Sequence, residues 1–193
     1  LHKCVLEGRD WFDAHYLCGP DQSGMSSGKK AASTRAANEA AAKQGRECVK
    51  ADEYDRIIVA AKTISSNPDL ASAFSNGRSE VSFFWMDGGV RLKMRIDYLK
   101  TATRGNRIIM GIGDLKSIGR DWRTDDFVQS CYNAIDDWMY HVQAAHYLDG
   151  ARHVKDAIAE ELVHIHHARE EFAVLPFLDR LSKAEAVAWQ WVF

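Results

Sequence analysis

Two aspartates and a lysine stand at the ends of apolar segments, where an aliphatic or turn residue would suffice. Asp97 ends the run KMRID, and Asp114 and Lys116 follow the run RIIMGIG. Residues two apart on a strand point to the same face, so the side chains of Asp114 and Lys116 should lie together. Two carboxylates can hold a divalent cation and a lysine can orient a water molecule, which metal-assisted phosphodiester cleavage requires. A surface ion pair is the alternative, but the apolar neighbours make uncompensated charge costly there.

The elements that must position these residues alternate between helical and extended patterns. EVSFFWMDGGVRLKMRIDYL contains two β-rich runs joined by Asp87-Gly88-Gly89, which predicts a hairpin. RIIMGIGDLKS predicts a third, buried strand, and AVAWQWVF predicts a last one. Helical spacing and stop signals predict helices at 29–45, 52–65, about 69–74 and 154–172. They also predict a helical region that Thr124 caps and that breaks near Asn133. These patterns indicate an α/β fold.

Composition sets the class of protein. A chain of 193 residues with 46% hydrophobic and 27% charged residues is ordinary globular chemistry, and we expect one domain over residues 1–193. No apolar run is long enough to span a bilayer. The four cysteines are scattered without a C-x-x-C pair, which argues against zinc or iron–sulfur sites and favours a reduced, cytoplasmic location. Both ends of the sequence look cut from a longer protein.

Charge is distributed unevenly along the chain, although the net charge is only -2. The stretches 26–50 and 91–107 each carry six basic residues, against two and one acidic residues respectively. The stretch 125–171 carries ten acidic residues and three basic ones. This asymmetry fits one surface for a polyanion and one acidic flank, while two solvated faces are an equally good interpretation from charge alone.

Four motifs in order resemble the PD-(D/E)XK nuclease superfamily. They are Glu80 in SEVSFFW, Asp97 in KMRID, the DLK of Asp114 to Lys116, and YHVQAAHY, which matches the Q-x-x-x-Y signature of the RecB-like and RecE-like branch. The phrases EVSFFWMD, YHVQAAHYLDGA and LHKCVLEGRDWFDAHY are most similar to RecE-like exonucleases of the exodeoxyribonuclease VIII type. The resemblance covers Leu1 to about Gly150 and returns in the last strand. The proline that usually precedes the first aspartate is Ile96 here.

The resemblance implies a restriction-endonuclease-like core, in which helices flank a central mixed sheet, and a role for each matching residue. His2, Asp97, Asp114 and the Leu115 carbonyl would bind Mg²⁺, for which Mn²⁺ could substitute, and Glu80 would join through a water. Lys116 would be the catalytic lysine. Gln143 and Tyr147 would hold either the DNA strand or the network around the lysine. The DNA-contacting residues expected from the basic stretches are Lys29, Lys30, Arg35 and Arg95.

By the same resemblance, the chain would be a bacterial or phage-encoded 5′-to-3′ exonuclease. It would degrade one strand of linear duplex DNA from an end, leave 3′ single strands for a RecT-like annealing protein, and form a ring-like oligomer with no membrane contact. The alternatives are another RecB-like DNA nuclease, helicase-linked or CRISPR-associated, and a non-catalytic DNA-binding module. The acidic segment 154–172, with its sequence HIHHAREE, has no counterpart in the resemblance.

Overall fold

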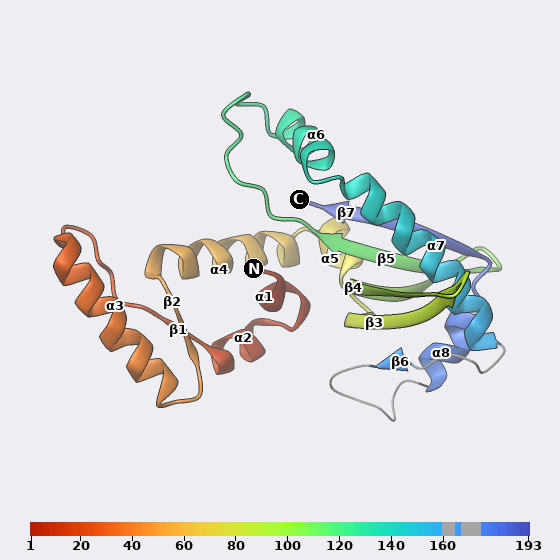
Figure 1. The fold of residues 1–193 in the computed structure, drawn as a ribbon, viewed down its shortest axis with the longest axis horizontal. Helices are drawn as coiled ribbons and strands as arrows, with labels where there is room; N and C mark the ends of the chain where they lie inside the picture. Colours follow the sequence, from red (N-terminus) through yellow and green to blue (C-terminus); the bar gives the residue numbers. More distant parts are fainter. Residues whose placement is uncertain (160–164, 167–174) are drawn as a thin grey trace. The chain divides into compact units, whose positions relative to one another are not determined.

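The protein divides into two compact units, Leu1–Ser72 and Ala73–Phe193. The structure is a computed structural model that describes residues 1–159, 165–166 and 175–193. Figure 1 labels the helices and strands of each unit. Within the described residues, no helix combines the length and the apolar character that crossing a membrane would require.

The first unit is mainly helical and contains a two-stranded parallel sheet. The Tyr54 hydroxyl donates a hydrogen bond to Asp13 Oδ1 at 2.6 Å, and the Tyr54 ring lies 5.5 Å from that of Phe12. These contacts join the second helix to the fourth. The elements of this unit are α1 (His2–Leu6), α2 (Arg9–His15), β1 (Tyr16–Cys18), α3 (Ser27–Ala42), β2 (Glu47–Val49) and α4 (Ala51–Ser66), and α5 (Pro68–Ala73) spans the boundary to the second unit.

The second unit contains a mixed sheet in the order β6-β3-β4-β5-β7. The β3, β4 and β5 strands form an antiparallel meander, β6 pairs antiparallel with β3, and β7 runs parallel to β5. The strands are β3 (Gly77–Asp87), β4 (Val90–Arg104), β5 (Arg107–Leu115), β6 (Ile165–His166) and β7 (Ala186–Val192). The helices are α6 (Phe127–Asp137), α7 (Tyr140–Ala159) and α8 (Leu175–Ser182). The expected α/β architecture with a mixed sheet and flanking helices is confirmed.

The core of this unit lies between the sheet and the two helices α7 and α8. Phe83 and Ile96 of the sheet are fully buried in one cluster with Ala151 of α7. Figure 1 shows α7 crossing the sheet, and it contacts β3, β4 and β7. Gly150 permits this approach, because a Cβ atom there would lie 2.5 Å from Cη2 of Trp85. The helix that carries the Q-x-x-x-Y residues is therefore held at a fixed position over the strands.

Most predicted elements form where expected. The hairpin turns at Gly88-Gly89, and the third and last strands are β5 and β7. The predicted helices at 29–45 and 52–65 correspond to α3 and α4, since Gly45 (φ 66°) and Pro68 stop them as glycine and proline signals do.

Three details of the helical region were wrong. Asp126, not Thr124, caps α6, because its carboxylate accepts a hydrogen bond from the Val128 N–H at 2.8 Å. The break between helices falls at Trp138 and Met139, where Met139 has a φ of 54°. Residues 154–159 of the expected acidic helix 154–172 continue α7, and Ile165–His166 is a strand; the remainder of that segment lies outside the described residues.

Candidate active site

The β4 and β5 strands bring two aspartates together. Asp114 lies at the end of β5, but Asp97, which was expected to end its strand, lies in the middle of β4 because pairing with β5 extends that strand to Arg104. Because Tyr98 pairs with Gly113, the next positions along these antiparallel strands are Asp97 and Asp114. The backbone N–H of Leu115 donates a hydrogen bond to Asp97 Oδ2 at 2.9 Å, which fixes one carboxylate against the neighbouring strand. Residues 17 apart in sequence thus become neighbours through the pairing register alone.

Both carboxylates are withdrawn from water. Asp114 is 2% exposed. Burial raises the pKa of Asp97 above its ordinary value, and the negative charge of Glu80 acts in the same direction. The Leu115 N–H and the Lys116 ammonium oppose this effect on the pKa. Because burial disfavours the ionised form of a carboxylate, a neighbouring cation would stabilise that form.

Lys116 is held in place by contacts from several elements. Its Nζ lies 2.8 Å from Asp114 Oδ2 and donates a hydrogen bond to Gln143 Oε1 at 2.8 Å. The same nitrogen lies 4.4 Å from the centroid of the Tyr140 ring, a cation–π distance. Its backbone N–H donates to the Val192 carbonyl of β7 at 2.8 Å. With only 12% of its side chain exposed, the ammonium group is confined to one position.

Gln143 and Tyr147 lie one turn apart on α7 and make different contacts. Gln143 contacts the lysine, as above, whereas the Tyr147 hydroxyl accepts a hydrogen bond from the Arg95 backbone N–H at 3.4 Å. The Tyr147 ring also packs on the Trp189 ring, with centroids 5.6 Å apart. Of the two roles open to this pair, the network around the lysine accounts for Gln143, and Tyr147 joins α7 to β4 and β7.

Glu80 stands beside the aspartates in an unusual backbone conformation. Ser79 pairs with Tyr98 and Val81 pairs with Ile96, so Glu80 is level with Asp97. Its φ of 55° is rare for a residue with a side chain and costs about 1–3 kcal/mol. The Glu80 carboxylate pairs with Arg95 Nε at 2.5 Å. A strained acidic residue next to Asp97 fits a role in metal or water binding, as predicted, but its observed partner is Arg95.

The remaining predicted residues lie in the first unit. His2 begins α1, and Lys29, Lys30 and Arg35 are exposed on α3. The role of His2 as a metal ligand stays a prediction. The exposure of the α3 cations is compatible with contacts to phosphates.

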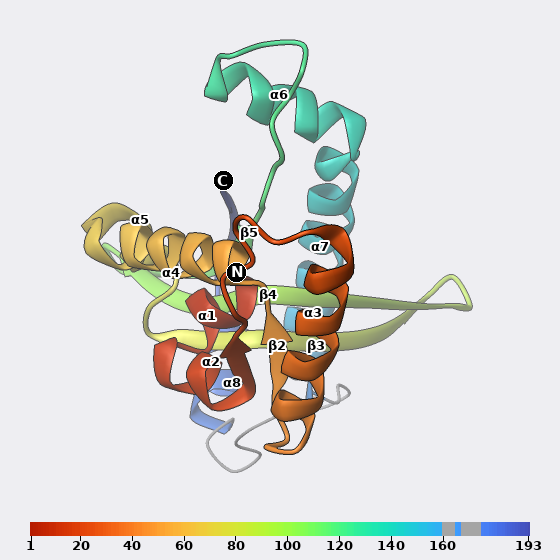
Figure 2. The same cartoon turned by 90° about the vertical axis from the view of Figure 1, so that its left-hand side faces the viewer.

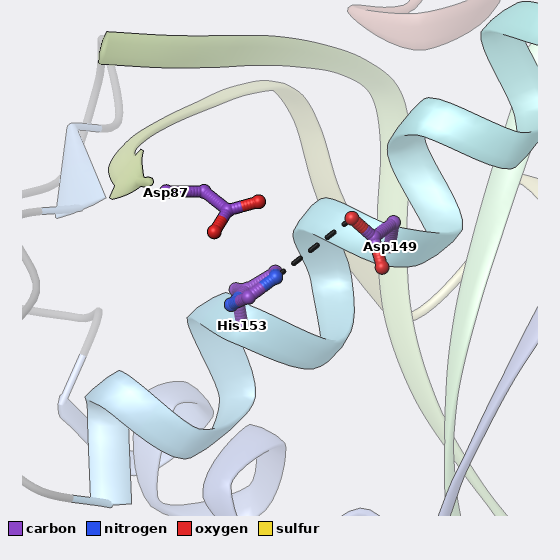
Figure 3. Close-up of side chains that lie close together, drawn as sticks. All are labelled: Asp87, Asp149 and His153. Atoms are coloured by element: carbon purple, nitrogen blue, oxygen red, sulfur yellow. Dashed lines mark ion pairs between the residues drawn. The ribbon is translucent and has the colours of Figure 1, made fainter. Parts of the chain in front are cut away.

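A second group of potential metal ligands was missed from the sequence. Asp87, at the end of β3, and Asp149 and His153, on α7, each offer a ligand atom, and these atoms lie within 4.8 Å of one another. Figure 3 shows the three side chains and the His153–Asp149 ion pair, whose Nε2 and Oδ2 atoms are 3.7 Å apart. All three residues are exposed. Only the i,i+4 spacing of Asp149 and His153 was visible in the sequence, and Asp87 required the tertiary fold.

Tyr140 was also missed as a contact of the lysine. Its spacing of three residues from Gln143 places both on one helical face, which is the signal that could have identified it. Its ring and the Gln143 carbonyl together surround one ammonium group.

A mixed sheet that brings a half-buried carboxylate, a buried carboxylate and a lysine together on adjacent strands is the arrangement of a PD-(D/E)XK-type domain. Residues 13–166 match the family model of a PDDEXK-like domain of unknown function (DUF3799), and the chain belongs to this family. No curated protein and no solved structure matches the chain. Membership supports a nuclease of the PD-(D/E)XK superfamily.

Such nucleases depend on divalent metal ions, and the residues present fit one. Asp97 and Asp114 offer oxygen ligands, which Mg²⁺ prefers. Burial raises the pKa of Asp97, so a neighbouring cation would stabilise the ionised form of this carboxylate. A bound cation would supply a Lewis acid for the phosphate group. Lys116 lies where it can hold a water molecule or balance charge on a phosphate oxygen.

Proposed function

We propose that this chain is a Mg²⁺-dependent deoxyribonuclease that hydrolyses DNA phosphodiesters, with Mn²⁺ able to substitute. The observation that carries the proposal is the buried Asp114–Lys116–Gln143 chain of contacts beside Asp97. Burying a lysine–carboxylate pair contributes little to stability, because the cost of removing both charges from water offsets their attraction. A pair that adds little to stability but is fixed by a glutamine and an aromatic ring is better explained by catalysis.

Each residue has a defined task in this proposal. Asp97 and Asp114 would hold the metal with the Leu115 carbonyl, and the RecE-like resemblance implies His2 as a further ligand. Lys116 orients the attacking water and stabilises the negative charge that develops on the phosphate. Gln143 and Tyr140 hold the ammonium group so that no reorientation is needed during the reaction. Glu80, already strained, would bind the metal through a water.

We further propose a RecE-like reaction on DNA ends. One strand of linear duplex DNA is degraded 5′ to 3′, which leaves a 3′ single strand for an annealing protein of the RecT kind. Lys29, Lys30 and Arg35 of α3 contact phosphates without reading sequence, together with Arg95. A ring-like oligomer would keep the enzyme on the duplex between successive cuts.

The decisive experiment compares Asp114→Asn with Asp149→Asn on linear and closed-circular duplex DNA of one sequence, in Mg²⁺. The amide is a poor metal ligand, so Asp114→Asn should abolish cleavage while the exposed Asp149→Asn control retains it. Wild-type protein should degrade the linear form and spare the circle. Loss of activity in Asp149→Asn alone would transfer the metal site to the Asp87–Asp149–His153 group. Equal loss of both DNA forms would mean an endonuclease.

A further inference from the structure

The segment that connects the catalytic lysine to the helix above it exposes an unusual amount of apolar surface. Large hydrophobic side chains in this connection are about half exposed or more, and Trp122 and Trp138 reach 90% and 72%. Figure 2 shows α6 and the preceding loop standing away from the sheet. The exposed large hydrophobic residues between Lys116 and Gln143 are Trp122, Phe127, Val128, Tyr132, Trp138, Met139 and Val142. Surface of this kind usually marks a binding site.

The same segment encloses a cleft of about 540 Å³, large enough for a small-molecule group. Trp122 and Trp138 line it with Tyr140, whose ring also contacts the Lys116 ammonium. Ser117, the residue directly after the lysine, lines it too. The cleft therefore adjoins the candidate active site, with the Tyr140 ring between it and the Lys116 ammonium.

The walls of the cleft are fixed before any ligand binds. Arg123 contacts Asp121 at 2.9 Å and Asp137 at 2.5 Å, and Asn133 donates a hydrogen bond to Asp121 at 2.7 Å. These contacts attach the loop to α6. The Arg123 side chain holds the pKa of Asp121 well below its ordinary value. Because Arg123 is paired with two carboxylates, the group as a whole carries a net negative charge and does not attract a phosphate.

The charge of this segment selects the kind of ligand. Between 117 and 139 there are two arginines and five aspartates, so charge does not draw phosphates into the cleft, and a bound strand must be held there through its bases. Three aromatic rings around a cleft instead favour an uncharged, flat ring. Nucleobases stack on tryptophan and tyrosine whatever their identity, and each stacked base contributes about 1–3 kcal/mol.

We infer that this cleft binds an unpaired nucleobase of the strand being cut, stacked on Trp122 and Trp138, next to the phosphate that Lys116 contacts. The inference rests on the proposed nuclease function. It adds that the protein recognises an unstacked base and that duplex must open beside the site. A protein partner is the competing occupant of an exposed apolar face.

The test measures binding without cleavage, in EDTA, by fluorescence anisotropy. The probes are a labelled oligothymidine and an abasic oligonucleotide of equal length, which has the phosphates but lacks the bases. Wild-type protein should bind oligothymidine about tenfold more tightly than the abasic strand, as stacking of one to two bases predicts. Trp138→Ala and Trp122→Ala should each remove most of that difference and leave abasic binding unchanged. Trp138→Phe should restore it, and Phe84→Ala, an aromatic residue 57% exposed on β3, should have no effect.

Each outcome has one meaning. Equal affinity of wild type for both strands overturns the inference, and so does unchanged base preference in both alanine variants. A change of oligomeric state in these variants with unchanged DNA binding assigns the face to a protein partner, which also overturns it. Trp122 is almost fully exposed, so its variant tests the idea even if Trp138→Ala fails to fold. If wild-type protein binds DNA in a base-dependent way but cleaves none, the proposed nuclease function is refuted. The proposed base-binding cleft would still be supported.

Discussion

Replacing Asp97 by asparagine should stabilise the metal-free protein while it removes a ligand of the proposed metal site. The asparagine side chain has the same shape, and its carbonyl oxygen can still accept the hydrogen bond from the Leu115 N–H. What disappears is a buried negative charge near a second carboxylate, Glu80. Wild type must ionise Asp97 at neutral pH against this environment, and the variant need not.

The direction of the pH dependence follows from the raised pKa of Asp97. The unfolded chain releases this proton near pH 3.9, and the folded chain releases it at higher pH. Between these two values the folded state binds more protons, so the unfolding free energy of wild type falls as pH rises. Below the window both proteins carry a neutral side chain, and their difference should be small.

The size of the effect is limited by partial compensation. An uncompensated buried charge costs several kcal/mol, but the Leu115 N–H and the Lys116 ammonium lower the pKa of Asp97 and offset part of that cost. We therefore expect about 1 kcal/mol of added stability for Asp97→Asn above the window. For a protein of this size, that corresponds to about 2–4 °C in Tm.

Thermal unfolding of both proteins in EDTA, followed by circular dichroism from pH 3.5 to pH 8, tests this reasoning. The gain of the variant should appear as pH rises and reach its maximum near neutral pH. Adding Mg²⁺ should raise the Tm of wild type only, because the cation binds the folded state through the carboxylate that the variant lacks. A variant that is less stable than wild type at neutral pH without metal would refute the charge argument.

Three further outcomes are expected. Lys116→Ala should lower the cleavage rate at saturating DNA by several orders of magnitude and change DNA affinity little, because the lysine charge acts in the transition state. Single-turnover kinetics measure the cleavage rate and equilibrium binding measures the affinity. Lost affinity with an unchanged cleavage rate would make Lys116 a phosphate contact. Gly150→Ala should destabilise the fold by about 1–3 kcal/mol in denaturant titrations, because the added methyl meets Trp85, whereas Gly28→Ala in the open α3 should be neutral or stabilising. Ca²⁺ should support DNA binding without efficient cleavage because its looser coordination misplaces the reacting water, and gel assays showing full activity in Ca²⁺ would remove the two-carboxylate site.

The sequence predicted those parts of the fold and site that depend on local pattern. Gly88-Gly89 and the alternation after it predicted the hairpin, and Asp114 and Lys116 at a spacing of two predicted the ion pair. It failed where distant segments meet. The contact between Tyr140 and the lysine depends on how α7 crosses the sheet, and no local signal indicates the positive φ of Glu80.

The helix boundaries show the same limit in the acidic region. Thr124 and Asp126 are both good capping residues, and only the path of the loop decides which one accepts the N–H of the first turn. Residues 154–159 read as the start of a separate acidic helix, but Val154 is buried in the core and continues α7.

The parallel strand β7 determines when the candidate active site can be completed during synthesis of the chain. The Val192 carbonyl that accepts the Lys116 N–H belongs to a strand translated long after Leu115, the residue it pairs with. Until β7 emerges from the ribosome, β5 is an open edge and the lysine backbone lacks this restraint. Pairing across so long a separation is also a slow folding event. A nascent chain should therefore remain harmless to nearby DNA, and a ribosome-stalled product that ends before Ala186 should not cleave it.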